Sequence, residues 1–226
     1  MPKTISIAID GPAGAGKSTI ARRLAEELNF RYVDTGAIYR TVAYFLDLWG
    51  ISPKDTDGIT RYLDELTIGI TYDDNGLQHM IMNGMDVTDD IRTQEIGQKA
   101  SLASAQPLVR EMLLDMQRDT AKQYNVVMDG RDIGTVVLPR ADVKIFLTAS
   151  AEVRAERRFR ELTAKGEKAS YDKVLAEIKQ RDYQDTHRQI APLKMARDSV
   201  KLDSSNMTVD EVLAEMKRII GQRVSL

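Results

Sequence analysis

Short apolar runs alternate with stretches of helical periodicity along most of the chain. Five of these runs have the length and composition of buried strands; they span Ile5–Ile9, Phe30–Val33, Val126–Met128, Val143–Leu147 and Val200–Leu202. Between them, apolar residues recur every three or four positions, as in Ile20, Leu24 and Leu28, so that each helix presents one apolar stripe. This alternation is typical of a doubly wound α/β fold, and we predict a five-stranded parallel sheet flanked by helices.

One segment breaks the alternation. Residues 67–88 have the pattern of alternating strands, with tight-turn signals at Asp74-Asn75-Gly76 and Met82-Asn83-Gly84, and we predict an antiparallel β insertion there. Helices are expected over Asp90–Ala105 and Leu108–Tyr124, and the capping-box pattern that begins at Thr208 predicts a last helix ending near Ile220. The short, Lys-rich stretch 163–172 has the composition of a mobile surface flap.

Composition narrows the class of protein. With 226 residues the chain is long enough for one domain with insertions. Its 32 basic and 34 acidic residues give a net charge of -2, which argues against a general binder of nucleic acid or anionic membranes. The sequence has no Cys, which excludes disulfides and thiolate metal sites, and no apolar run approaches the roughly 20 residues that span a bilayer. The first residues lack the pattern of a signal peptide, so we expect a soluble, cytoplasmic protein, by default a monomer.

A phosphate-binding loop follows the first predicted strand and precedes the first predicted helix. Residues 11–18 fit G-x-x-x-x-G-K-[ST], whose backbone N–H groups surround phosphate oxygens at a helix N-terminus. The expected ATP contacts are Gly11, Pro12, Ala13, Gly14, Ala15, Gly16, Lys17, Ser18 and Thr19. Lys17 is expected to reach the β- and γ-phosphates, and the Ser18 hydroxyl to ligate Mg²⁺. The alternative is a Gly-rich turn that binds nothing.

Two polar segments follow the second and third predicted strands, at the sheet edge where ligands bind in such folds. In the first, Thr35 can hydrogen-bond a base edge, Tyr39 offers an aromatic surface and Arg40 matches phosphate oxygens. In the second, Asp129 resembles the acidic residue that helps to hold Mg²⁺, usually through water, and is followed by Arg131 and Asp132 for phosphate and base. The alternatives are a capped, packed helix for the first segment and an ordinary strand-end turn for the second.

Two later helices carry basic faces. Arg154, Arg157 and Arg158 have the spacing of one helix face, and so do Arg181, Asp185 and Arg188. These faces can close arginines over a transferring phosphate while water is expelled. A solvated face whose arginines pair with Glu156 and Glu161 is the alternative, and it applies equally to Arg110 on an earlier helix.

The chain resembles the bacterial cytidylate kinases, a branch of the nucleoside monophosphate kinases in the P-loop class, over essentially its whole length. The resemblance rests on Ile9-Asp10-Gly11-Pro12 with the loop, Asp34-Thr35-Gly36-Ala37-Ile38-Tyr39-Arg40, Ile91-Arg92-Thr93-Gln94-Glu95, Asp129-Gly130-Arg131-Asp132-Ile133-Gly134-Thr135-Val136-Val137 and Ala191-Pro192-Leu193. It implies one P-loop kinase domain over 1–226, with an acceptor-binding region at about 35–105 that contains the β insertion and a lid at about 154–188.

The resemblance also implies contacts with the acceptor nucleotide. Carried over by position, they are Thr35, Arg110, Asp132 and Arg188 for the cytosine ring, Arg40, Arg131 and Arg181 for phosphate, and Asp185 for the sugar. Thr35 stands where other members carry Ser, a change that keeps the hydroxyl. The family takes dCMP well and UMP poorly, which fits an acidic residue that accepts from the exocyclic amine of cytosine.

The expected activity is therefore ATP-dependent phosphorylation of CMP and dCMP by in-line transfer, with Mg²⁺ and without a nucleophilic residue. The residues expected to neutralise the transferring phosphoryl group are Lys17, Arg131, Arg154, Arg157 and Arg158. Two rival hypotheses remain: a kinase for UMP, AMP or another small metabolite, and a nucleotide-binding switch without acceptor-dependent turnover. The β insertion could also be a protein-interaction surface, which is compatible with kinase activity.

Overall fold

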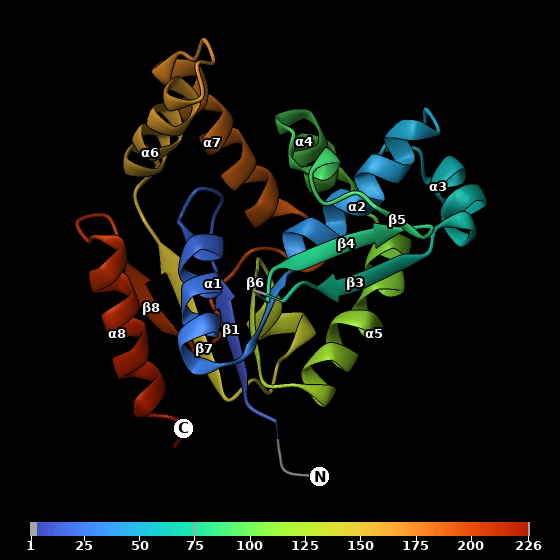
Figure 1. The fold of residues 1–226 in the computed structure, drawn as a ribbon. Helices are drawn as coiled ribbons and strands as arrows, with labels where there is room; N and C mark the ends of the chain where they lie inside the picture. Colours follow the sequence, from blue (N-terminus) through green and yellow to red (C-terminus); the bar gives the residue numbers. More distant parts are fainter. Residues whose placement is uncertain (1–3, 75, 226) are drawn as a thin grey trace.

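The computed structural model of the chain describes residues 4–74 and 76–225, and a five-stranded parallel sheet forms its centre (Figure 1). The strands are β1 (Ser6–Asp10), β2 (Arg31–Asp34), β6 (Val126–Gly130), β7 (Val143–Thr148) and β8 (Val200–Asp203), in the order β2-β6-β1-β7-β8. The predicted sheet is confirmed, and every strand ends one or two residues later than its apolar run. The polar residues that close the runs thus belong to the strands themselves.

Helices cover both faces of the sheet because successive strand residues point to opposite faces. Ile7, Ile9 and Val127 pack against α1 (Lys17–Leu28) and α8 (Val209–Gly221). Ala8 and Met128, which alternate with them, pack on the other face against α2 (Thr35–Leu48) and α5 (Pro107–Gln123). The predicted capping box at the start of α8 is present, with the Glu211 carboxylate accepting from the Thr208 N–H at 2.8 Å.

The predicted antiparallel insertion is also present. It consists of β3 (Ile68–Tyr72), β4 (Gln78–Met82) and β5 (Met85–Asp86), preceded by α3 (Thr56–Tyr62). Asn83 and Gly84 make the second turn with φ of 49° and 83°, as the turn signal predicts. In the first turn Gly76 has a φ of 73°, whereas Asn75 lies outside the described residues.

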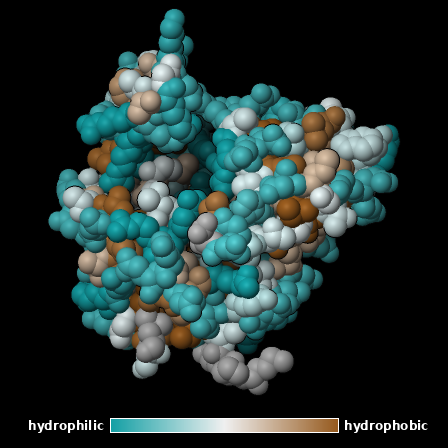
Figure 2. Space-filling view, viewed as in Figure 1, coloured by the Kyte–Doolittle hydropathy of each residue, from teal (hydrophilic) through white to brown (hydrophobic). Residues whose placement is uncertain are grey.

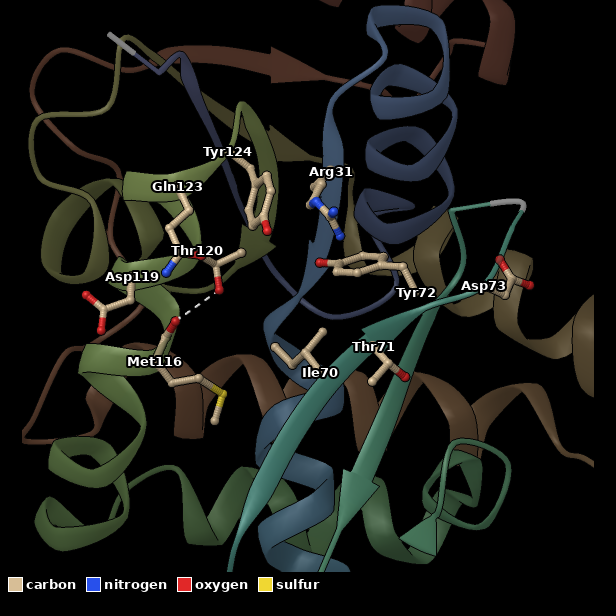
Figure 3. Close-up of a pocket in the computed structure, with 10 residues that line it drawn as sticks. All are labelled: Arg31, Ile70, Thr71, Tyr72, Asp73, Met116, Asp119, Thr120, Gln123 and Tyr124. Carbon is tan, nitrogen blue, oxygen red and sulfur yellow. Dashed lines mark hydrogen bonds between the residues drawn. The ribbon is translucent and has the colours of Figure 1, made fainter. Parts of the chain in front are cut away.

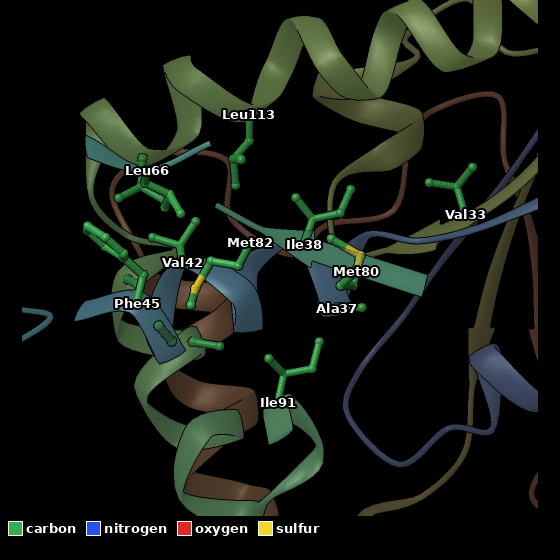
Figure 4. Close-up of a cluster of buried hydrophobic side chains, with 14 of the residues drawn as sticks. Val33, Ala37, Ile38, Val42, Phe45, Leu66, Met80, Met82, Ile91 and Leu113 are labelled. Atoms are coloured by element: carbon green, nitrogen blue, oxygen red, sulfur yellow. The ribbon is translucent and has the colours of Figure 1, made fainter. Parts of the chain in front are cut away.

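The insertion rests on a buried cluster that joins β4 to α2 (Figure 4). Met80 and Met82 lie among Ile38, Phe45 and Ile91, all nearly inaccessible to solvent. The insertion therefore shares one core with the body of the protein.

The helix expected over Asp90–Ala105 is wrong in its extent. A short 3₁₀ turn, Asp90–Arg92, precedes α4 (Gln94–Ala103), and the extended residue Thr93 separates them. The Thr93 hydroxyl accepts from the Ile96 N–H at 3.2 Å. Threonine is a good N-cap, so it starts a new helix here instead of continuing one.

The loop expected over residues 163–172 is shorter in the structure, because the helices on both sides extend into this stretch. They are α6 (Ala151–Ala164) and α7 (Tyr171–His187), which pack antiparallel on a small cluster of their own that includes Ala155, Leu162, Val174 and Ile178. Figure 1 shows this pair standing above the carboxyl edge of the sheet. In the described part of the chain, no helix is both long and apolar enough to cross a bilayer.

Leu113 on α5 is fully buried in the α2 and insertion core, which predicts a large cost of truncation. Leu113→Ala should lower the free energy of unfolding by about 2–5 kcal/mol, since it removes buried methyl groups and leaves a cavity. Urea denaturation followed by circular dichroism measures this. Leu108→Ala, at a position on the same helix that is 37% exposed, is the control and should cost about 0.5 kcal/mol or less. Equal losses in the two variants would contradict the core assignment.

Candidate active site

The carboxyl ends of β1, β2 and β6 meet at one edge of the sheet. Asp10 of β1 lies opposite Gly130 of β6, and Asp34 of β2 lies opposite Asp129. The phosphate loop and the two polar segments singled out in the sequence begin at these strand ends. Parallel pairing therefore brings together segments that are about 100 residues apart in the sequence.

The phosphate loop has the backbone conformation of an anion cradle. Gly11 has a φ of 152°, and a Cβ there would lie 1.9 Å from the carbonyl oxygen of Leu147, so no other residue fits. Gly16 has a φ of 88°, and a Cβ there would meet nothing within 4 Å. Helix α1 begins at the next residue, Lys17, so its first free N–H groups and its dipole face this open space.

Lys17 is a buried cation held in the loop. Its Nζ donates to the Pro12 carbonyl oxygen at 2.8 Å. Burial lowers the pKa of Lys17 to about 7, and the nearby charge of Arg131 acts in the same direction. A phosphate group in the loop would oppose both effects, so the lysine is poised to gain from an anion.

A hydroxyl and a carboxylate meet beside the loop. The Ser18 hydroxyl donates to Asp129 Oδ2 at 3.1 Å, and the Tyr32 hydroxyl donates to Asp129 Oδ1 at 2.8 Å. Burial raises the pKa of Asp129 to about 6, and the charge of Asp34 adds to this. Magnesium prefers hard oxygen ligands, takes few of them from the protein and keeps several waters. Ser18 and Asp129 fit that donor set, and among residues 4–74 and 76–225 no group of three or more acidic or His side chains is arranged to hold a metal ion.

The turn after β6 is held by Asp10. Its carboxylate accepts from the backbone N–H groups of Ile133 and Gly134, both at 2.7 Å, where a short π-helical turn, Ile133–Val137, begins. Burial raises the pKa of Asp10 to about 6 against the effect of these hydrogen bonds. Arg131 and Asp132 precede this turn directly, so Asp10 orients both of them.

A buried ion pair network surrounds Asp132. Arg110 of α5 and Arg188, which follows α7, donate to opposite oxygens of its carboxylate, Arg188 at 3.3 Å. The Arg110 guanidinium also lies 5.7 Å from the centre of the Tyr39 ring. Three of the predicted base contacts, Arg110, Asp132 and Arg188, therefore lie together with the Tyr39 ring, although the four residues come from four different segments of the chain.

Thr35 lies beside this network, but its hydroxyl is already engaged. It donates to the backbone carbonyl oxygen of Asp129 at 2.7 Å. A Cβ at Gly130 would lie 2.7 Å from the Thr35 hydroxyl, so the glycine is what allows this close approach. The hydroxyl oxygen still has lone pairs with which it can accept a hydrogen bond.

The guanidiniums of Arg131 and Arg181 lie next to Asp185, and that of Arg40 lies near Arg181. Arg131 donates to Asp185 Oδ2 at 2.8 Å, and although burial alone would lower the pKa of Arg131, this carboxylate raises it. Burial lowers the pKa of Arg181 to about 10, and the charge of Arg131 acts in the same direction. Arg181 Nε is buried and has no hydrogen-bond partner. Burial also lowers the pKa of Arg40, with Arg131 and Arg158 among the like charges that contribute.

Of the four arginines of α6, the three predicted to neutralise the transferring phosphoryl group have different partners. Arg154 donates to the Ala13 carbonyl oxygen of the loop at 3.0 Å and is clamped by Asp182 of α7 at 2.6 and 3.0 Å. Arg157 donates to the Ser204 carbonyl oxygen, beyond β8, at 2.6 Å. Arg158 pairs with Glu161 of its own helix at 3.0 Å, as the surface-pair alternative expects. Only Arg154 of the three contacts the phosphate loop directly.

Sequence reasoning missed several residues of this site. Tyr32, Asp182 and Ser104 were not predicted, and Asp10 and Arg92 were noticed only as parts of motifs. Ser104 accepts from Arg188 Nη1 at 3.2 Å, and Arg92 donates to Asp34 Oδ2 at 2.9 Å. Asp34 also caps α2 by accepting from the Ala37 N–H at 2.9 Å, which is the structural alternative considered for it. No local pattern marks these residues, since their partners are far away in the sequence.

Comparison with known proteins agrees with this geometry. The model of the family described as cytidylate kinase matches residues 7–222. A cytidylate kinase of Carboxydothermus hydrogenoformans is 50% identical over 217 residues, which cover 96% of this chain and 97% of that protein. One from Clostridium tetani is 42% identical over 220 residues and covers 97% and 95%. Among solved structures, an uncharacterized protein from Eubacterium ventriosum has a TM-score of 0.51 at 14% identity over 97% of this chain and 100% of its own, a likeness of fold alone. The chain belongs to the cytidylate kinase family.

Proposed function

We propose that this chain transfers the γ-phosphoryl group of ATP to the phosphate of CMP or dCMP, and that the residues described above carry out the transfer. One observation carries the assignment of the residues. Burial lowers the pKa of Lys17 in the phosphate loop and that of Arg181 on α7, and the nearby charge of Arg131 acts in the same direction on both. This group of neighbouring cations extends from the proposed donor loop to the proposed acceptor side, as transfer between two phosphates requires.

The chemistry needs positioning more than acid–base catalysis. The phosphate of CMP is already anionic at neutral pH and can attack the γ-phosphoryl group in line without a general base. Lys17 and the loop N–H groups hold the donor phosphates. Arg131, Arg40 and Arg181 hold the acceptor phosphate, and Arg154, Arg157 and Arg158 supply further positive charge when the donor is bound.

Ser18 and Asp129 are the residues that would hold Mg²⁺, with Asp129 acting through water. The Tyr32 hydroxyl keeps the Asp129 carboxylate oriented towards Ser18. Mg²⁺, when bound, neutralises charge on the donor phosphates.

Base selection falls to the network around Asp132. Its carboxylate can accept from the exocyclic amine of cytosine, whereas the carbonyl of uracil offers no proton at that position. Arg110 and Arg188 donate to the same carboxylate and hold it in place, and the Tyr39 ring lies beside Arg110. Thr35 accepts from the ring, and Asp185 faces the sugar.

The proposal treats residues 1–226 as one kinase domain. Residues 35–105, with the β insertion at 67–88, form its acceptor-binding region, and residues 154–188 form its lid, in agreement with the hollow that Figure 2 shows between the α6–α7 pair and the side of α2 and α4. ATP, CMP and dCMP are the partners, with no nucleic acid or membrane, and the working expectation is a cytoplasmic monomer.

ADP formation from ATP and Mg²⁺, measured separately with CMP, dCMP, UMP, AMP and GMP, tests the proposed function. Turnover with CMP and dCMP alone supports it. Turnover with another acceptor would overturn the base assignments, and ATP binding without turnover on any acceptor would favour a nucleotide switch.

Lys17→Ala deletes the buried charge at the donor phosphates, and we expect kcat with CMP to fall by about 10²–10³-fold. Steady-state ADP formation measures it. Lys122→Ala, at a position whose side chain is 72% exposed on α5, serves as the control and should retain full activity. Residual activity near that of the wild type would remove Lys17 from the mechanism.

Asp132→Asn keeps the shape of the side chain but removes its charge from between Arg110 and Arg188. We expect the ratio of kcat/KM for CMP to that for UMP to fall by about tenfold or more, because the strong acceptor for the cytosine amine is lost. Competing assays with both nucleotides measure this ratio. Asp119→Asn on the exposed face of α5 is the matched control. An unchanged ratio in the Asp132 variant argues for a purely structural carboxylate.

Arg181→Met should stabilise the ligand-free protein while weakening phosphate binding. The charged guanidinium is buried beside Arg131 and lacks a partner at Nε, so its removal is expected to raise the free energy of unfolding by on the order of 1 kcal/mol. Thermal unfolding with and without CMP measures both effects, and the increase in Tm on adding CMP should shrink. Arg160→Met, at a site 77% exposed, is the control. A Tm of ligand-free Arg181→Met below that of the wild type would contradict the prediction that the Arg181 charge destabilises the ligand-free protein.

A further inference from the structure

Strand β2 leads directly into the proposed acceptor site, yet it lies at the edge of the parallel sheet. An edge strand leaves backbone N–H and C=O groups without a strand partner on its outer side. In residues 4–74 and 76–225 no strand pairs with that side of β2, since the insertion forms a separate sheet. The outer groups of β2 are bonded instead by side chains of the insertion.

Two of these side chains come from the facing ends of β3 and β4. The Tyr72 hydroxyl donates to the Tyr32 carbonyl oxygen at 3.0 Å. The Gln78 side chain binds both backbone groups of Asp34: Oε1 accepts from the Asp34 N–H at 2.8 Å, and Nε2 donates to the Asp34 carbonyl oxygen at 3.3 Å. Gln78 is 2% exposed, so water cannot replace these bonds at low cost.

The same junction is reinforced at the other end of β2. The Arg31 guanidinium lies 4.7 Å from the centre of the Tyr72 ring and 4.0 Å from that of Tyr124, at the end of α5. These three side chains line a pocket of about 610 Å³ between β2, β3 and α5. Figure 3 shows them pointing toward one another. Cation–π contacts of this kind hold the two segments together without a strand pair.

The position of Asp34 gives these bonds a functional consequence. Asp34 is the N-cap of α2, and Thr35 is the first residue of that helix. Tyr39 and Arg40 follow one turn later. Together with Thr35 they are the residues of α2 that line the proposed acceptor site. A shift of the Asp34 backbone would therefore move all three of these side chains relative to Asp132 and Arg131.

We propose that Gln78 is a positioning residue for the acceptor nucleotide, and that the β insertion serves as an internal brace of β2. The inference rests on the proposed acceptor site. Gln78 itself does not contact the nucleotide. Its side chain holds the backbone at the start of α2. In this position of the helix Thr35 reaches the Asp129 carbonyl oxygen and Arg40 lies near Arg131.

Gln78→Met tests the proposal, because Met has nearly the same shape but can neither donate to nor accept from the Asp34 backbone. We expect the KM for CMP to rise by about tenfold, which corresponds to roughly 1.4 kcal/mol, with a lower preference for CMP over UMP. The KM for ATP should be unchanged, since the phosphate loop follows β1 and not β2. A wild-type KM for CMP in this variant would overturn the proposal.

Met82→Ala is the matched control for simple loss of stability. Met82 lies on the same strand, is 2% exposed and packs in the core without contacting Asp34 through hydrogen bonds. It should lower Tm without changing the KM for CMP, and an equal rise of KM in both variants would show a general loss of stability and overturn the positioning role. Tyr72→Phe, which removes only the bond to Tyr32, should raise the KM for CMP in the same direction by a smaller factor.

If Gln78→Met does not fold, Tyr72→Phe tests the proposal in its place. An unchanged KM for CMP in Tyr72→Phe would then overturn the proposal that the β insertion braces β2. The proposed function is tested independently of these variants: it would be contradicted if the wild-type protein did not phosphorylate CMP. Thr35→Ala separates the site assignment from the brace: normal kinetics in that variant, beside a raised KM in Gln78→Met, would refute the role of Thr35 and leave the role of Gln78 standing.

Discussion

The Asp10 carboxylate, at the end of the central strand β1, accepts two backbone N–H groups of the turn that follows β6. This interaction joins the start of the phosphate loop to the segment that carries Arg131 and Asp132. Burial opposes the charge on Asp10, so the two short hydrogen bonds are what hold an ionised group there. The phosphate loop and the turn after β6 are thereby held together by hydrogen bonds within the protein itself.

Around this fixed point, the charges fall into two kinds. Asp132 and Asp185 lie between arginines and are satisfied in the ligand-free protein. Lys17 and Arg181 are cations whose pKa is lowered by burial and, after it, by the nearby charge of Arg131. A negatively charged group placed beside these two cations would oppose both effects.

Much of the fold was already determined by the sequence alone. The apolar runs are short and end in polar residues, and their period differs from that of the helices, so the parallel sheet and the flanking helices follow from local pattern. The loop at Gly11 and the turn at Asn83 depend on backbone conformations that few residues adopt, and the pattern at Thr208 depends on contacts within one helical turn. Such features need no distant partner, and for this reason they were predictable. Thr93 was not predicted to separate two elements. It lies inside a stretch of helical periodicity, so the sequence pattern predicted one continuous helix there.

The arrangement of the site was decided only by the tertiary structure. Which arginines face phosphate and which pair at the surface is a matter of distant partners: Arg154 meets Asp182 and the loop, whereas Arg158 turns to Glu161. The roles of Tyr32 and Gln78 likewise arise from backbone and side-chain groups far away in the sequence. Hydrogen bonds and ion pairs act over a few ångströms in space, and a sequence records spacing along the chain. The local sequence therefore determines the helices, the strands and the side chains available for chemistry. Packing determines which of these side chains come into contact.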